Sequence, residues 1–97
     1  MRAGKNLRKM TGLELIAKER KEQIEKHGYT VDNDVQNNNN RQLLNAAGAL
    51  MAGSMLRPTS WCQESWHHMS VKPKKERLII AGALIAAEID RLNAGGE

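Results

Sequence analysis

The chain of 97 residues has no phenylalanine, a single cysteine, two prolines, one tyrosine and two tryptophans. Because Cys62 stands alone, an internal disulfide is excluded, and the composition fits a reducing cytoplasm. No run reaches the roughly 18 consecutive apolar residues of a membrane-spanning helix. The N-terminal MRAGKNLRKM lacks the apolar stretch of a secretory signal. We therefore expect a cytoplasmic protein with no membrane partner.

A core without phenylalanine must be built from Ala, Leu, Ile and Met, with Trp61, Trp66 and Tyr29 as the only aromatic residues. Such small side chains bury little apolar area each, and a chain of this length is near the size at which one core gives modest stability. We expect residues 1–10 to form a flexible basic tail and residues 11–94 to form one helical domain. That domain is expected to borrow surface from other copies in a homo-oligomer.

Three segments carry helical signals. Thr11-Gly12-Leu13-Glu14 has the form of a capping box and Gly28 stands where a glycine often ends a helix, which predicts a helix over 12–27. NRQLLNAAGALMAGSM, residues 40–55, is small or apolar on nearly every face and predicts a central buried helix, capped by Asn39 or Asn40. Lys72-Pro73 opens a third predicted helix, over 73–93. Between them, WCQESWHHMSV (61–71) shows no clear period and is expected to hold at most a short turn.

The sequence Ala-Gly-Ala-Leu occurs at 47–50 and again at 81–84. A glycine inside a helix costs about 1 kcal/mol relative to alanine. Gly48 and Gly82 therefore predict places where helix backbones nearly touch, either each other or those of a symmetry mate. The fold class predicted is all-α: a small bundle of three main helices around an Ala/Gly-rich central one.

Two carboxylates, Glu19 and Glu22, share a face of the first predicted helix because they are three residues apart. All-helical nucleotide pyrophosphatases of the MazG type use such a pair, with a Glu-x-x-Asp pair on the next helix, to hold magnesium. The second pair is missing here, since Glu88 and Asp90 are two residues apart and so lie on different faces.

Other chemistries have weaker support. Cys62, His67 and His68 lack the paired short spacings of structural zinc sites, and no oxyanion donor is evident for a cysteine nucleophile. The basic residues of the first helix are interleaved with acids, which disfavours a nucleic-acid partner despite a net charge of +4. We expect no metal, no other cofactor and no catalytic residue.

The segment RPTSWCQESWHHMSVKPKKER, residues 57–77, gathers aromatic and basic side chains. Aromatic faces stack on bases, whereas Arg and Lys bind phosphates, and the start of the third helix adds free backbone N–H groups. This composition favours an anionic, nucleotide-like small molecule, although the tryptophans could equally fill the core. The predicted ligand-binding residues are Arg57, Trp61, Trp66, His67, Lys72, Lys74 and Arg77, together with Arg20 and Tyr29.

Arg20 has two interpretations. It could form a buried ion pair with Asp34 or Glu88 that holds the loop after the first helix, or it could belong to the wall of a polar pocket.

The run Ile16-x-x-Glu19-Arg20-x-x-Gln23-Ile24, continued by Gly28-Tyr29-Thr30 and Asn33-Asp34, resembles a set of small, uncharacterised phage and prophage proteins. Their pattern reads Glu-Arg-x-x-Gln-Ile, then Gly-Trp-Thr, then His-Asp-Asp. A tryptophan-containing loop with Lys-Pro and a final helix similar to RLIIAGALIAAEIDRL extend the resemblance over residues 13–92. The loss of the histidine and of one carboxylate here would damage a metal or acid–base site more than a binding site.

These observations favour binding over catalysis. We predict a phage-type oligomer in the host cytoplasm that sequesters a nucleotide-derived signal of host defence. The alternatives are a magnesium-dependent nucleotide pyrophosphatase that uses Glu19, Glu22 and Asp34, and a protein–protein inhibitor of a host factor.

Overall fold

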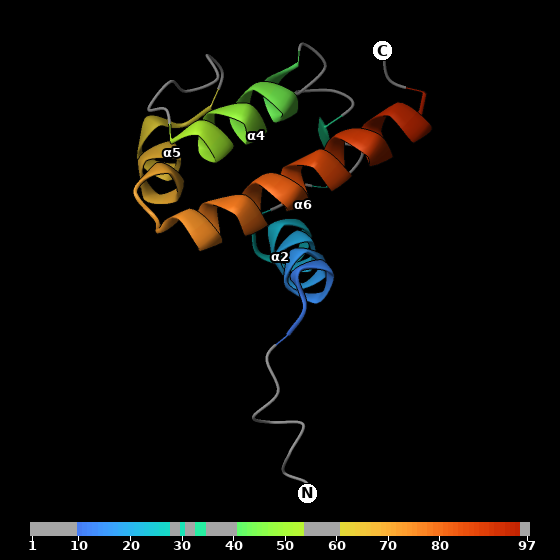
Figure 1. The fold of residues 1–97 in the computed structure, drawn as a ribbon. Coiled ribbons are helices and arrows are strands. Elements are labelled where there is room, and N and C mark those ends of the chain that lie inside the picture. Colours follow the sequence, from blue (N-terminus) through green and yellow to red (C-terminus); the bar gives the residue numbers. More distant parts are fainter. Residues whose placement is uncertain (1–9, 28–29, 31–32, 35–40, 54–60, 96–97) are drawn as a thin grey trace, which may run out of the picture.

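The computed structural model describes residues 10–27, 30, 33–34, 41–53 and 61–95, and its helices are arranged as Figure 1 shows. They are α2 (Gly12–His27), α4 (Gln42–Ala52), α5 (Gln63–Ser70) and α6 (Lys74–Asn93). These residues hold no β-strand, so the all-α prediction is confirmed for them. None of the helices in the described ranges is long and apolar enough to cross a membrane.

Helix α5 corrects the prediction of three main helices. It has eight residues, and Trp66 is its one buried side chain. With a single buried position, the segment has no apolar repeat in its sequence, and its helical form therefore depends on the docking of Trp66 into the core.

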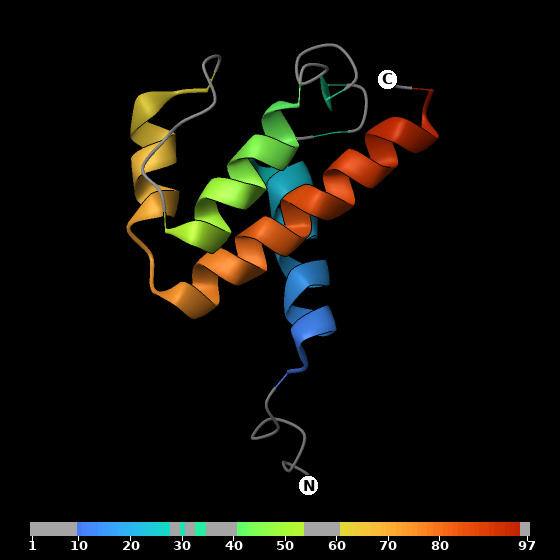
Figure 2. The same cartoon turned by 45° about the horizontal axis from the view of Figure 1, so that its top comes forward.

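Helix α6, rather than the segment predicted over 40–55, is the helix against which the others pack. In Figures 1 and 2, α4 runs antiparallel along one side of α6 and α2 crosses α6 on another side. Only one face of α4 meets α6, so Leu44 and Met51 of α4 remain 40% and 48% exposed. The prediction that the apolar segment 40–55 forms the central helix is therefore wrong for the described residues.

The core lies mainly between α4 and α6. Half of the buried hydrophobic residues in the described ranges are alanines, which lets the two helices approach closely but buries little area per residue. Trp66 fills the end of this core, and Trp61 packs edge-on against it with ring centroids 6.1 Å apart. The core cluster comprises Leu43, Ala46, Ala47, Leu50, Trp66, Ile80, Ala81, Leu84 and Ala87.

The start of α2 is the predicted capping box. The Thr11 backbone N–H donates to Glu14 Oε1 at 2.7 Å, and the Glu14 backbone N–H donates to Thr11 Oγ1 at 3.1 Å. The predicted helix over 12–27 has the observed bounds of α2. The predicted stop at Gly28, the caps at Asn39 and Asn40, and residues 1–9 of the tail lie outside the described residues.

The two Ala-Gly-Ala-Leu segments differ in packing. A β-carbon placed on Gly82 would lie 2.5 Å from Cδ1 and 2.8 Å from Cγ1 of Ile16, so the α6 backbone and the Ile16 side chain of α2 are closely packed there. A β-carbon on Gly48 would meet no described atom within 4 Å. The prediction that helix backbones nearly touch is therefore not confirmed at either glycine: Gly82 is packed against a side chain of α2, and Gly48 has no close neighbour among the described residues.

Candidate small-molecule pocket

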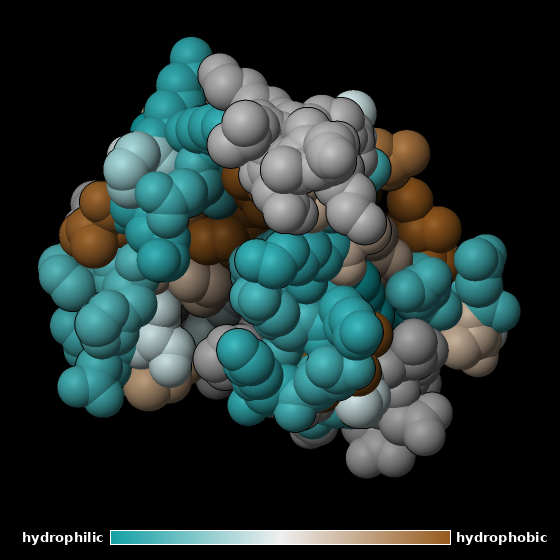
Figure 3. All heavy atoms as spheres, turned by 90° about the horizontal axis from the view of Figure 1, so that it is seen from below, coloured by the Kyte–Doolittle hydropathy of each residue, from teal (hydrophilic) through white to brown (hydrophobic). Residues whose placement is uncertain are grey.

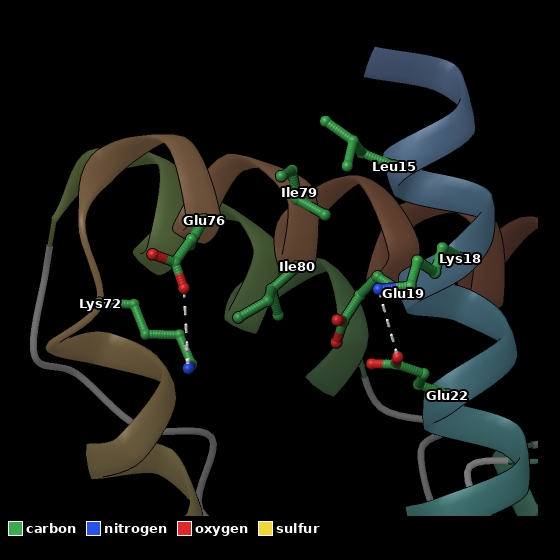
Figure 4. Close-up of a pocket in the computed structure, with 8 residues that line it drawn as sticks. All are labelled: Leu15, Lys18, Glu19, Glu22, Lys72, Glu76, Ile79 and Ile80. Atoms are coloured by element: carbon green, nitrogen blue, oxygen red, sulfur yellow. Dashed lines mark ion pairs between the residues drawn. The ribbon is translucent and has the colours of Figure 1, made fainter. Parts of the chain in front are cut away.

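A pocket of about 370 Å³ lies between α2 and α5 near the start of α6. A smaller pocket of about 180 Å³, drawn in Figure 4, adjoins it and shares Glu19, Glu22, Lys72 and Ile80. We call the two together the interhelical pocket. The larger part is lined by Glu19, Glu22, Gln23, Ser65, His68, Met69, Lys72 and Ile80.

The α2 wall of the pocket is acidic and polar. Glu19, Glu22 and Gln23 share one face of α2 because they are three and four residues apart. Gln23 is only 2% exposed, and its Nε2 donates to Glu19 Oε2 at 3.2 Å. Its Oε1 is buried and accepts no hydrogen bond from the part of the chain that the structure describes. A buried acceptor of this kind is costly to leave unsatisfied.

The opposite wall carries one charge of each sign. In Figure 4 Lys72 and Glu76 lie across the pocket from Glu19 and Glu22. Lys72 Nζ is 3.9 Å from Glu76 Oε1, and Lys18 Nζ is 3.8 Å from Glu22 Oε2. Long, exposed ion pairs of this type contribute about 0–1 kcal/mol each, so these side chains can exchange partners when a ligand enters.

Metal ligation has little support in this part of the chain. No group of three or more His, Cys, Asp or Glu side chains among the described residues is placed to hold a metal ion. Glu19 and Glu22 remain as a pair of carboxylates on one wall. Asp34, the third predicted ligand, is fully buried and does not line the pocket.

Behind the pocket wall lies a buried cluster of charged residues. Arg20 is 8% exposed, and its Nη2 lies 3.3 Å from Asp90 Oδ2 of α6, a partner that the sequence did not indicate. Arg91 donates from Nε and Nη2 to the two oxygens of Glu88, each at 2.8 Å. These hydrogen bonds hold the pKa of Glu88 below its usual range and raise the pKa of Arg91. The cluster attaches α2 to the C-terminal half of α6.

The residues predicted to bind a ligand fall into several groups. Lys72 lines the interhelical pocket, whereas His67 and Lys74 are exposed and do not line it. Arg57 and Tyr29 lie outside the described residues.

Two of the residues predicted to bind a ligand have structural contacts instead. Trp66 is 3% exposed, which leaves no ring face for a base to stack on. Arg77 donates from Nη1 to the Leu50 carbonyl oxygen at 2.6 Å and from Nε to the Lys72 carbonyl oxygen at 3.1 Å. Arg77 therefore satisfies a carbonyl in the last turn of α4, as cationic side chains often do at helix C-termini.

Sequence reasoning missed the contribution of α5 to the pocket. Ser65, His68 and Met69 line the pocket from α5, a helix that packs against α6. The spacing of Glu19, Glu22 and Gln23 was a usable signal for the α2 wall, although it was interpreted as half of a metal motif.

Comparison with known proteins found no matching family model, no significantly similar curated protein and no significantly similar solved structure.

Proposed function

We propose that this protein binds and sequesters an anionic, nucleotide-derived small molecule in the interhelical pocket. The observation that carries the proposal is the mixed lining: Glu19, Glu22 and Gln23 from α2, with His68 of α5 and Lys72 among the other lining residues. The volume of about 370 Å³ suits a small ligand.

The lining can recognise the two ends of a nucleotide separately. Amino and imino N–H groups of a base would donate to the carboxylates of Glu19 and Glu22, which are acceptors. Phosphate oxygens would accept from the Lys72 ammonium group and from a ring N–H of His68. Met69 and Ile80 supply apolar surface against which a base can pack.

The biological setting of the proposal comes from the sequence resemblance. A phage-encoded protein in the host cytoplasm that removes a nucleotide signal would counter host defence without catalysis. We propose that it acts as a homo-oligomer, because the alanine-rich core gives one copy little buried area.

The proposal is tested on protein purified from cells and then denatured. Mass spectrometry of the released small molecules should find an intact nucleotide-derived compound, and calorimetry against a panel of linear and cyclic nucleotides should identify the class. Glu19→Gln and Lys72→Met should each weaken binding about 10- to 100-fold, the loss expected for one charge-assisted hydrogen bond. Lys75→Met is the matched control, because Lys75 is exposed on α6 and does not line the pocket.

Several results would reject this function. They are the absence of binding to any nucleotide in the panel, or equal affinities for wild type and both pocket variants. If no small molecule is released at all, the alternative of protein–protein inhibition gains support.

A magnesium-dependent nucleotide pyrophosphatase remains a second candidate, supported by the placement of Glu19 and Glu22 on the pocket wall (Figure 4). Two carboxylates three residues apart can share one hard cation with a substrate phosphate. This candidate predicts pyrophosphate release that stops when a chelator is added, and loss of turnover in Glu22→Gln. Recovery of intact ligand after incubation with magnesium would contradict it.

A further inference from the structure

Helix α6 has an apolar stripe on the side that faces away from the core. Leu78, Ile85, Ile89 and Leu92 are 42%, 36%, 53% and 46% exposed. Their spacings of seven, four and three residues follow the 3.5-residue repeat of a helix-pairing seam. Gly82, at the edge of this stripe, is packed against Ile16 of α2 and is not part of it. The four exposed positions fall within about 60° on the helical wheel, and none of them is charged. We call this stripe the α6 seam.

Helix α4 widens this surface. Leu44, Met51 and Ile85 each directly follow a buried leucine, so the exposed stripe lies about 100° round from the buried face in both helices. The two helices face each other through their buried leucines and run antiparallel (Figures 1 and 2). A rotation of the same size and hand about each helix axis therefore brings both exposed stripes to the same side of the helix pair. Figure 3 shows hydrophobic atoms at the surface on the right, where the C-terminal half of α6 lies in Figure 1. No seam residue lines the interhelical pocket.

We propose that the α6 seam is the interface of a two-fold symmetric homodimer, in which the α6 helices of two copies pack antiparallel with Ile85 at the axis. The argument is the self-complementary spacing of the seam. Leu78 lies seven residues before Ile85 and Leu92 lies seven residues after it. An antiparallel pair centred on Ile85 therefore places Leu78 against Leu92 of the partner subunit twice, as an isologous interface requires.

The available area agrees with a dimer. Helix α6 has 20 residues and α4 has 11, which correspond to lengths of roughly 30 Å and 16 Å. A face two helices wide then measures roughly 500 Å² per copy, or roughly 1,000 Å² for the pair, the lower limit for a specific interface. The alanine-rich core gives the chain a physical reason to use this surface.

Cross-linking tests the register. In a Cys62→Ser background, Ile85→Cys should form a covalent dimer with a short bis-maleimide reagent, because the residue meets its own copy at the axis. Leu78→Cys alone should cross-link at least tenfold less, whereas an equal mixture of Leu78→Cys and Leu92→Cys chains should cross-link efficiently. Leu13→Cys is the control, since Leu13 is 79% exposed on α2 and lies off the seam.

Sedimentation tests the face itself. Wild type should have twice the chain mass of 10.8 kDa, and Ile89→Glu should fall to the chain mass while its helical circular dichroism is retained. Leu13→Glu should remain a dimer. A wild type that is monomeric at 100 µM overturns the proposal. So does an oligomer of any size that neither cross-links through position 85 nor responds to Ile89→Glu.

Discussion

At the scale of single residues, two arginines join different helices and a third forms a buried ion pair within one helix. Arg20 joins α2 to Asp90 of α6, and Arg77 joins α6 to the last turn of α4. Arg91 forms a bidentate pair with Glu88 within α6. A guanidinium group suits this role because it stays charged and presents several donors in a fixed plane.

Arg77→Ala should lower the free energy of unfolding by about 1.5–3 kcal/mol, because two backbone carbonyls, one of them at the end of α4, lose a charged donor. Urea denaturation measures this change. Lys75→Ala, on the exposed side of the same helix turn, should change it by less than about 0.5 kcal/mol. If Arg77→Ala leaves stability unchanged but abolishes ligand binding, the result would instead support Arg77 as a ligand-binding residue.

Glu88→Gln should destabilise the protein at pH 7 by about 1.5–3 kcal/mol, because the buried Arg91 loses a bidentate, charge-assisted pair and keeps only the more distant charge of Asp34. The pKa of Glu88 is lowered in the folded state by the hydrogen bonds from Arg91. Its contribution to stability is therefore complete above the ordinary value of 4.5 and is lost as the pH falls through the lowered folded value. The stability difference between wild type and Glu88→Gln should shrink only in that acidic window. A difference that stays constant down to pH 3 would contradict this account.

At the scale of helices, local signals were sufficient for α2 and α6. The capping box at Thr11 and the proline before Lys74 are sequence-local features, so the predicted bounds match α2 and differ by one residue at the start of α6. The helix α5 was missed because one buried tryptophan makes no repeat. The central position of α6 and the pocket that α5 completes are tertiary features, which no repeat within one segment can encode. Of the predicted ligand residues that the structure describes, Lys72 lines the pocket.

The two identical Ala-Gly-Ala-Leu segments offer a matched pair of substitutions. Gly82→Ala should cost about 1–3 kcal/mol, because its β-carbon would collide with Ile16. Gly48→Ala should instead stabilise the protein by about 0.5–1 kcal/mol, because the site has room and alanine is the better helix former. Both are measured as shifts in denaturation midpoint at one protein concentration. If Ile16→Ala restores the stability of Gly82→Ala, the collision is the cause, and equal effects at both glycines would contradict the assigned packing.

At the scale of the whole molecule, the interhelical pocket and the exposed apolar surface of α4 and α6 are formed by different residues. The charged interhelical pocket involves α2, α5 and the start of α6, whereas the α6 seam and the exposed stripe of α4 are apolar and share no residue with it. This separation allows a dimer to form without closing either pocket, so each copy could bind its own ligand.

If pairing through the α6 seam completes a small core, stability must depend on protein concentration. A tenfold rise in concentration adds about 1.4 kcal/mol per dimer to the free energy of unfolding. For two chains of this size, that corresponds to a rise in melting temperature of roughly 3 °C. Thermal melts of wild type between 5 and 500 µM should show this dependence. Ile89→Glu should melt at a lower temperature that does not change with concentration, because folding no longer involves a second copy. A wild-type melting temperature that is constant over the whole range would show that the exposed leucines and isoleucines of α6 do not contribute to stability through self-association.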